Sequence, residues 1–154
     1  MVAATEIRMG TPYPVLNAFM RCRERVSAIM GPLGSGKTFA AVQRLLQHMV
    51  EQEPNAQGER PTRFLAIRNC YPDLMSTTVK DWLAVFGEGS GGLGKMRYGG
   101  LEPPTYRVGF NLEDGTRVLS EVVFLALDRE DSVRRLRGQQ CTGVWFNEMK
   151  ELVK

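Results

Sequence analysis

The chain has 154 residues, of which 43% are hydrophobic and 24% are charged, and its formal net charge is +3. This length and composition predict one soluble globular domain with a core of its own. Three widely spaced cysteines form no C-x-x-C pair, which favours reduced thiols over a disulfide or metal framework. The first residues lack the apolar core of a signal peptide and no stretch approaches membrane-spanning length, so we expect no association with a membrane.

The first third of the chain predicts a strand, a glycine-rich turn and a helix. After an irregular segment over residues 1–20, "RVSAIM" (25–30) is expected to form a short strand. An amphipathic helix is expected to begin at Lys37 and to end before Pro54. Its inward positions are predicted to be Phe39, Val42, Leu46 and Met49, and its outward positions Gln43, Arg44, Gln47 and Glu51.

The middle of the chain predicts another strand and helix, followed by a loop. The apolar run at 63–67 is typical of a buried strand. Residues 72–86 predict a helix with Pro72 in its first turn and with apolar positions facing the core, namely Val79, Trp82, Leu83 and Phe86. The glycine-rich stretch 87–100 is expected to be a flexible loop.

The last third predicts a β-hairpin, a basic helix and a final strand. Residues 105–110 and 118–127 are the expected hairpin strands around the turn "EDGT". Residues 131–138 predict a short basic helix that Gly138 ends, and residues 143–146 a strand. Strands and helices alternate for most of the length, which predicts an α/β fold.

The octapeptide "GPLGSGKT" (31–38) matches the phosphate-loop pattern G-x-x-x-x-G-K-[ST] in full, between a predicted strand and a predicted helix. Its glycines let the backbone wrap closely around phosphate oxygens, and amides at a helix N-terminus attract an anion. We therefore expect ATP to bind here, with Lys37 on the β- and γ-phosphates and the Thr38 hydroxyl on Mg²⁺. The predicted nucleotide-binding residues are Gly31, Gly34, Ser35, Gly36, Lys37 and Thr38. The alternative is a glycine-rich turn that only caps a helix.

The stretch "VWFNE" (144–148) ends an apolar strand in polar residues, as the strand opposite a phosphate loop should. Glu148 directly follows the strand-end residue, where a general base would orient the attacking water. Asp128, after "FLAL", is the competing acid. Glu148 could also be a solvated residue that opens a helix.

Two longer stretches resemble the large terminase subunits of tailed phages. They are "IRNCYPDLMSTTVKDWLAVF" (67–86) and "FLALDREDSVRRLRGQQCTGVWFNEMKEL" (124–152), and the likeness runs from about residue 25 to 154. The resemblance implies a P-loop NTPase of the additional-strand, catalytic-glutamate type, with a mainly parallel sheet flanked by helices and a β-hairpin insertion. Its sheet places a later strand between the phosphate-loop strand and the strand before Glu148. Residues 1–154 are therefore expected to be the N-terminal part of an ATPase domain, without its remainder or a nuclease domain.

The resemblance also implies roles and partners. Lys37 and Glu148 would be catalytic, and Thr38 and Asn147 would lie on the metal side, since one branch of the family has Asn-Glu at the strand end. Arg137 would be a finger that reaches a neighbouring subunit's ATP, with Arg134 and Arg135 as alternatives and a solvated basic face equally good. The activity implied is ATP-driven packaging of double-stranded DNA in the host cytoplasm, by a ring on the portal of a procapsid with a small terminase subunit.

Two other functions stay open from the residues alone. The chain could belong to another ring or helicase-type ATPase with the same core. It could also be a nucleotide-binding assembly module without hydrolysis, in which Asn147 marks a degenerate metal site.

Overall fold

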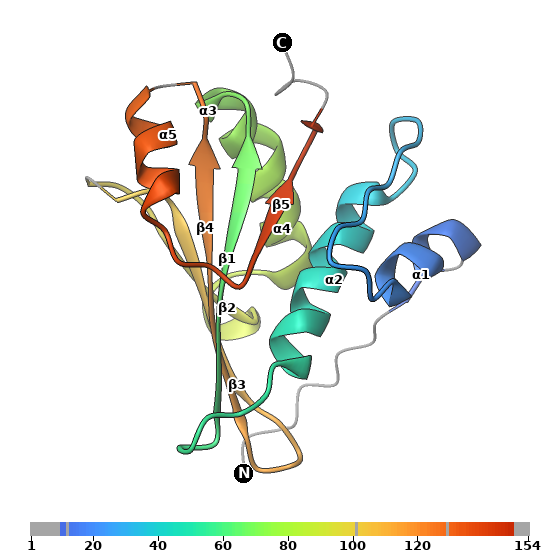
Figure 1. Cartoon of the computed structure of the whole chain (residues 1–154), viewed down its shortest axis with the longest axis vertical. Coiled ribbons are helices and arrows are strands. Elements are labelled where there is room, and N and C mark those ends of the chain that lie inside the picture. The colour runs from blue at the N-terminus through green and yellow to red at the C-terminus, as the bar shows by residue number, and fades with distance from the viewer. Residues whose placement is uncertain (1–9, 12, 101, 129, 150–154) are drawn as a thin grey trace.

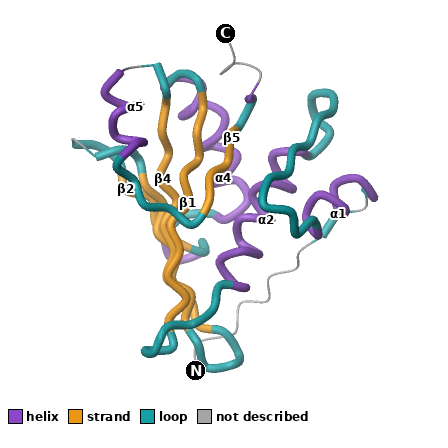
Figure 2. Tube along the Cα trace, viewed as in Figure 1, coloured by secondary structure: helices purple, strands orange, loops and turns teal. Residues whose placement is uncertain are grey.

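A five-stranded sheet with helices on both faces forms the centre of the chain (Figures 1 and 2). The computed structural model describes residues 10–11, 13–100, 102–128 and 130–149. The elements in chain order are α1 (Pro14–Arg21), α2 (Lys37–Glu51), β1 (Glu59–Arg68), α3 (Tyr71–Asp73), η1 (Leu74–Val79), α4 (Lys80–Phe86), η2 (Gly89–Gly91), β2 (Gly94–Arg97), β3 (Thr105–Asn111), β4 (Arg117–Ala126), α5 (Glu130–Arg137) and β5 (Gly143–Phe146). The predicted α/β class is confirmed.

The sheet is mixed rather than mainly parallel. Its strand order is β2-β3-β4-β1-β5, and β1 pairs in parallel with β4 on one side and β5 on the other. The pairings of β3 with β4 and of β2 with β3 are antiparallel. The predicted hairpin is present as β3 and β4. It is an integral part of the sheet rather than an insertion, because β4 also pairs with β1.

One face of the sheet carries the main core. Helix α2 and the continuous helix formed by α3, η1 and α4 pack on this face. Trp82 is fully buried, and its ring meets Phe86, Tyr106 and Phe124 edge to face at centroid distances of 4.7, 5.7 and 5.9 Å. This geometry is favourable for aromatic pairs and confirms the inward face predicted for residues 72–86.

Helix α1 corrects the prediction of an irregular N-terminal segment. Pro14 occupies its first turn, where the missing amide hydrogen costs no bond. Leu16 and Met20 are buried against Ala40 of α2. This contact also explains why Gln43 and Arg44 are buried although they were predicted to face outward, since α1 covers that side of α2. The prediction for Phe39 is wrong in the opposite sense, because its side chain is 44% exposed.

The strand predicted at residues 25–30 does not form. These residues have no regular structure, and Val26 and Met30 are 84% and 93% exposed. A strand needs a hydrogen-bonded neighbour, and the edge next to β5 has none among the described residues.

The opposite face of the sheet carries a smaller apolar cluster under α5. Leu136 of α5 packs against a patch made by alternate residues of β1 and β4, namely Leu65, Ile67, Val123 and Leu125. The presence of α5 and β5 confirms the predicted basic helix and the predicted final strand. The glycine-rich stretch 87–100 is only partly a loop, because it contains η2 and the edge strand β2. None of the helices that the structure describes has the length and apolar character needed to cross a bilayer.

Candidate functional site

The predicted phosphate loop leads directly into α2, with Gly36 as its N-terminal capping residue. Gly34 and Gly36 have φ angles of +74° and +79°, in the left-handed region that favours glycine. A methyl group at Gly36 would also lie 3.0 Å from Leu16 Cδ1, so α1 packs tightly under the loop. The backbone itself therefore favours glycine at positions 34 and 36.

The Lys37 ammonium lies over its own loop. Its Nζ donates to the carbonyl oxygens of Gly31 and Pro32 at 2.8 and 2.6 Å, and lies 3.3 Å from Ser35 Oγ. No carboxylate pairs with this ammonium among the described residues, so its charge is not neutralised. Thr38 follows in the first turn of α2 and is half-buried. Ammonium, hydroxyl and helix N-terminus together fit an anion such as a nucleotide phosphate.

The other predicted residues follow strand β5. Asn147 is 7% exposed, and its backbone amide donates to the Ile67 carbonyl of β1 at 2.9 Å. Its side-chain Nδ2 donates to Thr78 Oγ1 at 2.8 Å. Figure 1 shows the N-terminal end of α2 and the carboxyl end of β5 toward the same end of the molecule. Both halves of the predicted site therefore lie toward the same end of the molecule.

Glu148 is half-buried and has an unusual backbone. Its φ angle is +59°, and no other non-glycine residue in the described part of the chain has a positive φ. Such a conformation costs energy and persists only where the surrounding structure enforces it, and it occurs often at functional sites. The backbone thus supports the interpretation of Glu148 as a functional residue. Its role as a base stays a prediction.

The competing acid, Asp128, has a structural contact. Its carboxylate Oδ2 accepts a hydrogen bond of 3.0 Å from the Tyr71 amide, at the first turn of the helix that runs to Phe86. A carboxylate at this place satisfies a helix amide that has no partner within the helix and favours the positive end of the helix dipole. This contact explains an acid after β4 without catalysis, and it favours Glu148 as the candidate base.

The predicted arginine finger lies on α5, on the face of the sheet opposite α2. Arg134 and Arg137 are exposed, and the side chain of Arg135 lies outside the described residues. Leu136 fixes the helix to the apolar patch of β1 and β4. The described contacts do not join these arginines to the phosphate loop, and a role in a neighbouring subunit's site stays a prediction.

No group of three or more His, Cys, Asp or Glu residues in the described part of the chain could hold a metal ion. Mg²⁺ commonly takes only one or two protein ligands and completes its shell with phosphate oxygens and water. The Thr38 hydroxyl and the Asn147 amide oxygen are oxygen ligands of the kind that such a sparse site uses. A magnesium site here stays a prediction.

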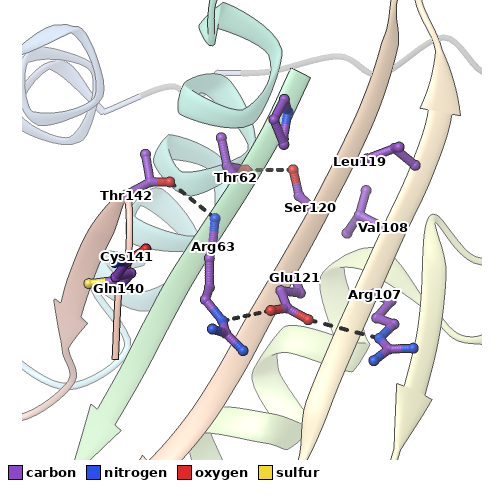
Figure 3. A pocket seen from close by; sticks show the side chains of 11 residues that line it. Thr62, Arg63, Arg107, Val108, Leu119, Ser120, Glu121, Gln140, Cys141 and Thr142 are labelled. Atoms are coloured by element: carbon purple, nitrogen blue, oxygen red, sulfur yellow. Dashed lines mark hydrogen bonds and ion pairs between the residues drawn. The ribbon is translucent and has the colours of Figure 1, made fainter. Parts of the chain in front are cut away.

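A groove on the sheet face that carries α5 lies away from these residues (Figure 3). Across its floor, Arg63 Nε lies 2.6 Å from Glu121 Oε1, and Arg107 Nε lies 3.9 Å from Glu121 Oε2. At its side, Thr142 Oγ1 accepts a hydrogen bond of 3.1 Å from the Arg63 amide. None of the predicted site residues lines this groove, and its charges are largely paired with one another.

The sequence interpretation missed Thr78, which contacts a predicted site residue, and Arg68, which bonds the neighbouring threonine. Thr78 receives the Asn147 side chain, and Arg68, at the end of β1, donates to Thr77 Oγ1 at 2.9 Å. One signal was available for Thr78. It lies one residue before Val79 and four before Trp82, on the inward face of its helix, where a polar side chain needs a partner.

Residues 28–154 match the family described as the terminase large subunit, T4likevirus-type, N-terminal part. The match covers more than half of the chain, and it includes the phosphate loop, the helix from Tyr71 to Phe86 and the end of β5. No curated protein and no solved structure matches the chain.

Proposed function

The chain belongs to the family of terminase large subunits, and we propose that it is the ATP-hydrolysing part of a motor that packages double-stranded viral DNA into procapsids. Membership in this family supports a role in DNA packaging. The observation that carries the proposal of ATP binding is the phosphate loop, where two left-handed glycines and the unneutralised Lys37 ammonium surround the N-terminus of α2.

In the proposed mechanism each residue has a separate task. Lys37 turns from its loop carbonyls to the β- and γ-phosphates, where a charge-assisted bond is stronger than a neutral one. The Thr38 hydroxyl would hold Mg²⁺, with the Asn147 side-chain oxygen as an outer ligand, and the metal would neutralise phosphate charge. Glu148 orients and deprotonates the attacking water. Arg137, or Arg134 or Arg135 on the same helix, stabilises charge in a neighbouring subunit's site.

The proposed partners follow from the same family membership. They are double-stranded DNA, the portal of a procapsid, a small terminase subunit and further copies of this chain in a ring, all in the host cytoplasm. A finger supplied from α5 would make hydrolysis depend on this ring, because one subunit's ATP would then need its neighbour's arginine.

Two substitutions in the full-length protein test the proposal. Lys37→Ala removes the ammonium and should weaken ATP binding by about tenfold or more in calorimetry. The exposed Lys95 on β2 provides a matched control, since Lys95→Ala removes the same charge from the molecule away from the loop. Glu148→Gln should leave binding intact and lower turnover by a factor on the order of 100. Unchanged affinity in Lys37→Ala, or full turnover in Glu148→Gln, would contradict the assignment.

A further inference from the structure

Two consecutive threonines in one helix receive hydrogen bonds from the ends of two neighbouring parallel strands. Asn147, directly after β5, donates from Nδ2 to Thr78 Oγ1 at 2.8 Å. Arg68, the last residue of β1, donates from Nη1 to Thr77 Oγ1 at 2.9 Å. Two side-chain hydrogen bonds thus attach the helix from Tyr71 to Phe86 to the carboxyl ends of β1 and β5, next to the candidate site.

The helix has a rare geometry where these bonds are made. Residues Leu74–Val79 form a π-helical turn between two α-helical segments. A π turn contains more residues than an α turn, so neighbouring side chains diverge less around the helix axis, and Thr77 and Thr78 can both face the strand ends. Such turns inside α-helices are frequent at functional sites. The π turn therefore provides the geometry in which Thr77 and Thr78 can each accept a hydrogen bond from a strand end.

The contact with Thr78 restricts the Asn147 side chain. Thr78 is fully buried and Asn147 is 7% exposed, so water does not replace a lost partner easily. The Asn147 backbone is also held, through its amide, by the Ile67 carbonyl at 2.9 Å. With Nδ2 used for Thr78, Oδ1 is the amide atom left for a metal-bound water.

We infer that Thr78 is a positioning residue, which orients the Asn147 amide so that its oxygen serves the Mg²⁺–ATP complex. This inference rests on the proposed function and deepens it. It also connects the helix from Tyr71 to Phe86 directly to the proposed nucleotide site. If nucleotide binding moves the side-chain amide of Asn147, its hydrogen-bond partner Thr78 must move with it or lose the bond.

Three variants of the full-length protein separate positioning from simple packing. Thr78→Val keeps the shape and removes the hydroxyl, whereas Thr78→Ser keeps the hydroxyl. Thr62→Val is the matched control, because Thr62 is also buried and shares a hydroxyl–hydroxyl bond of 2.6 Å with Ser120, near the other end of β1. ATP turnover in motors assembled on procapsids is then measured over a range of Mg²⁺ concentrations.

Thr78→Val should lower kcat by about tenfold or more and raise the Mg²⁺ concentration for half-maximal rate. The reason is that the buried Asn147 Nδ2 loses its acceptor, so the side chain is no longer held in one orientation. Thr78→Ser should restore both values, and Thr62→Val should leave the Mg²⁺ dependence unchanged. An unchanged Mg²⁺ dependence in Thr78→Val would overturn the inference. So would an equal shift in Thr62→Val, because the effect would then reflect general stability.

A second measurement does not depend on hydrolysis. The side-chain amide signal of Asn147 can be assigned in asparagine-labelled protein by its loss in Asn147→Asp, and it should shift in Thr78→Val but not in Thr62→Val. A signal that Thr78→Val does not move would overturn the inference even in an active motor. If the signal moves but the wild-type motor does not hydrolyse ATP, the proposed function fails and the positioning contact stands.

Discussion

Removal of the Arg44 guanidinium is expected to release helix α1 from α2. Arg44 is 8% exposed, and its Nη1 and Nη2 donate to the carbonyl oxygens of Phe19 and Cys22 at 2.7 and 2.8 Å. Its guanidinium carbon also lies 5.0 Å from the centre of the Phe19 ring. In the described part of the chain no carboxylate pairs with Arg44. Its charge instead contacts carbonyl oxygens at the C-terminal, negative end of α1, where a cation is favoured.

The size of the effect follows from these contacts. Hydrogen bonds to a charged group contribute about 1.5–3 kcal/mol each, but the buried guanidinium also loses hydration that a methionine would not lose. For Arg44→Met we therefore expect a net loss of about 2 kcal/mol in the attachment of α1. Since 1.36 kcal/mol corresponds to tenfold, this is a roughly thirtyfold change in the opening equilibrium.

Amide hydrogen exchange measures this opening directly. Helix α1 has eight residues, too few to be stable alone, so its protection reports its packing on α2. Exchange of the α1 amides in Arg44→Met should be roughly thirtyfold faster, while that of β1 is unchanged. Arg23→Ala is the control, because Arg23 also joins the end of α1 to α2 through Glu51, but at an exposed position where an ion pair contributes little. Unchanged exchange in Arg44→Met, or equal acceleration in Arg23→Ala, would refute this reasoning.

Two further predictions concern pH and assembly. Burial, together with the Arg44 guanidinium, lowers the pKa of His48 below its usual value of 6.5. As the pH falls through this range, the unfolded state therefore binds more protons than the folded state does. The free energy of unfolding should therefore fall between about pH 7 and pH 5, and urea titrations should show a flatter pH dependence in His48→Gln. Inactive motors of Arg137→Ala and of Glu148→Gln should regain some turnover when their subunits are mixed, and a lack of rescue at every ratio would argue against a finger acting between subunits.

Elements with a strong local pattern could be predicted from the sequence. Helix α2 begins at the predicted Lys37, and the hairpin, the basic helix and the final strand lie within a few residues of their predicted places. Each combines a clear hydrophobic period with a turn or capping signal, and both depend only on nearby residues. The family resemblance is confirmed by the match over residues 28–154.

Features that depend on distant partners could not be predicted in this way. The run 25–30 has the composition of a strand but finds no neighbour among the described strands. The helical pattern of α2 predicts that Arg44 faces solvent, but α1 covers it in the structure. Helix α1 could not be predicted, because eight residues are too few for a reliable periodic signal. In the candidate site, the glycine conformations follow from the motif. The contact between Asn147 and Thr78 requires both the register of β5 on β1 and a π turn, and neither is visible in sequence.

This contact also bears on why an amide occupies position 147, where this kind of strand usually ends in a carboxylate. The side chain is 7% exposed, so a carboxylate there would be buried, and burial disfavours its charged form whenever no metal is bound. An amide avoids that cost, and it can donate to Thr78 while its oxygen remains an acceptor. A carboxylate could only accept, which would force the Thr78 hydroxyl to become the donor. The neutral side chain can thus keep its hydrogen bond to Thr78 when no metal is bound, and under the proposed function Mg²⁺–ATP would supply the charges on binding.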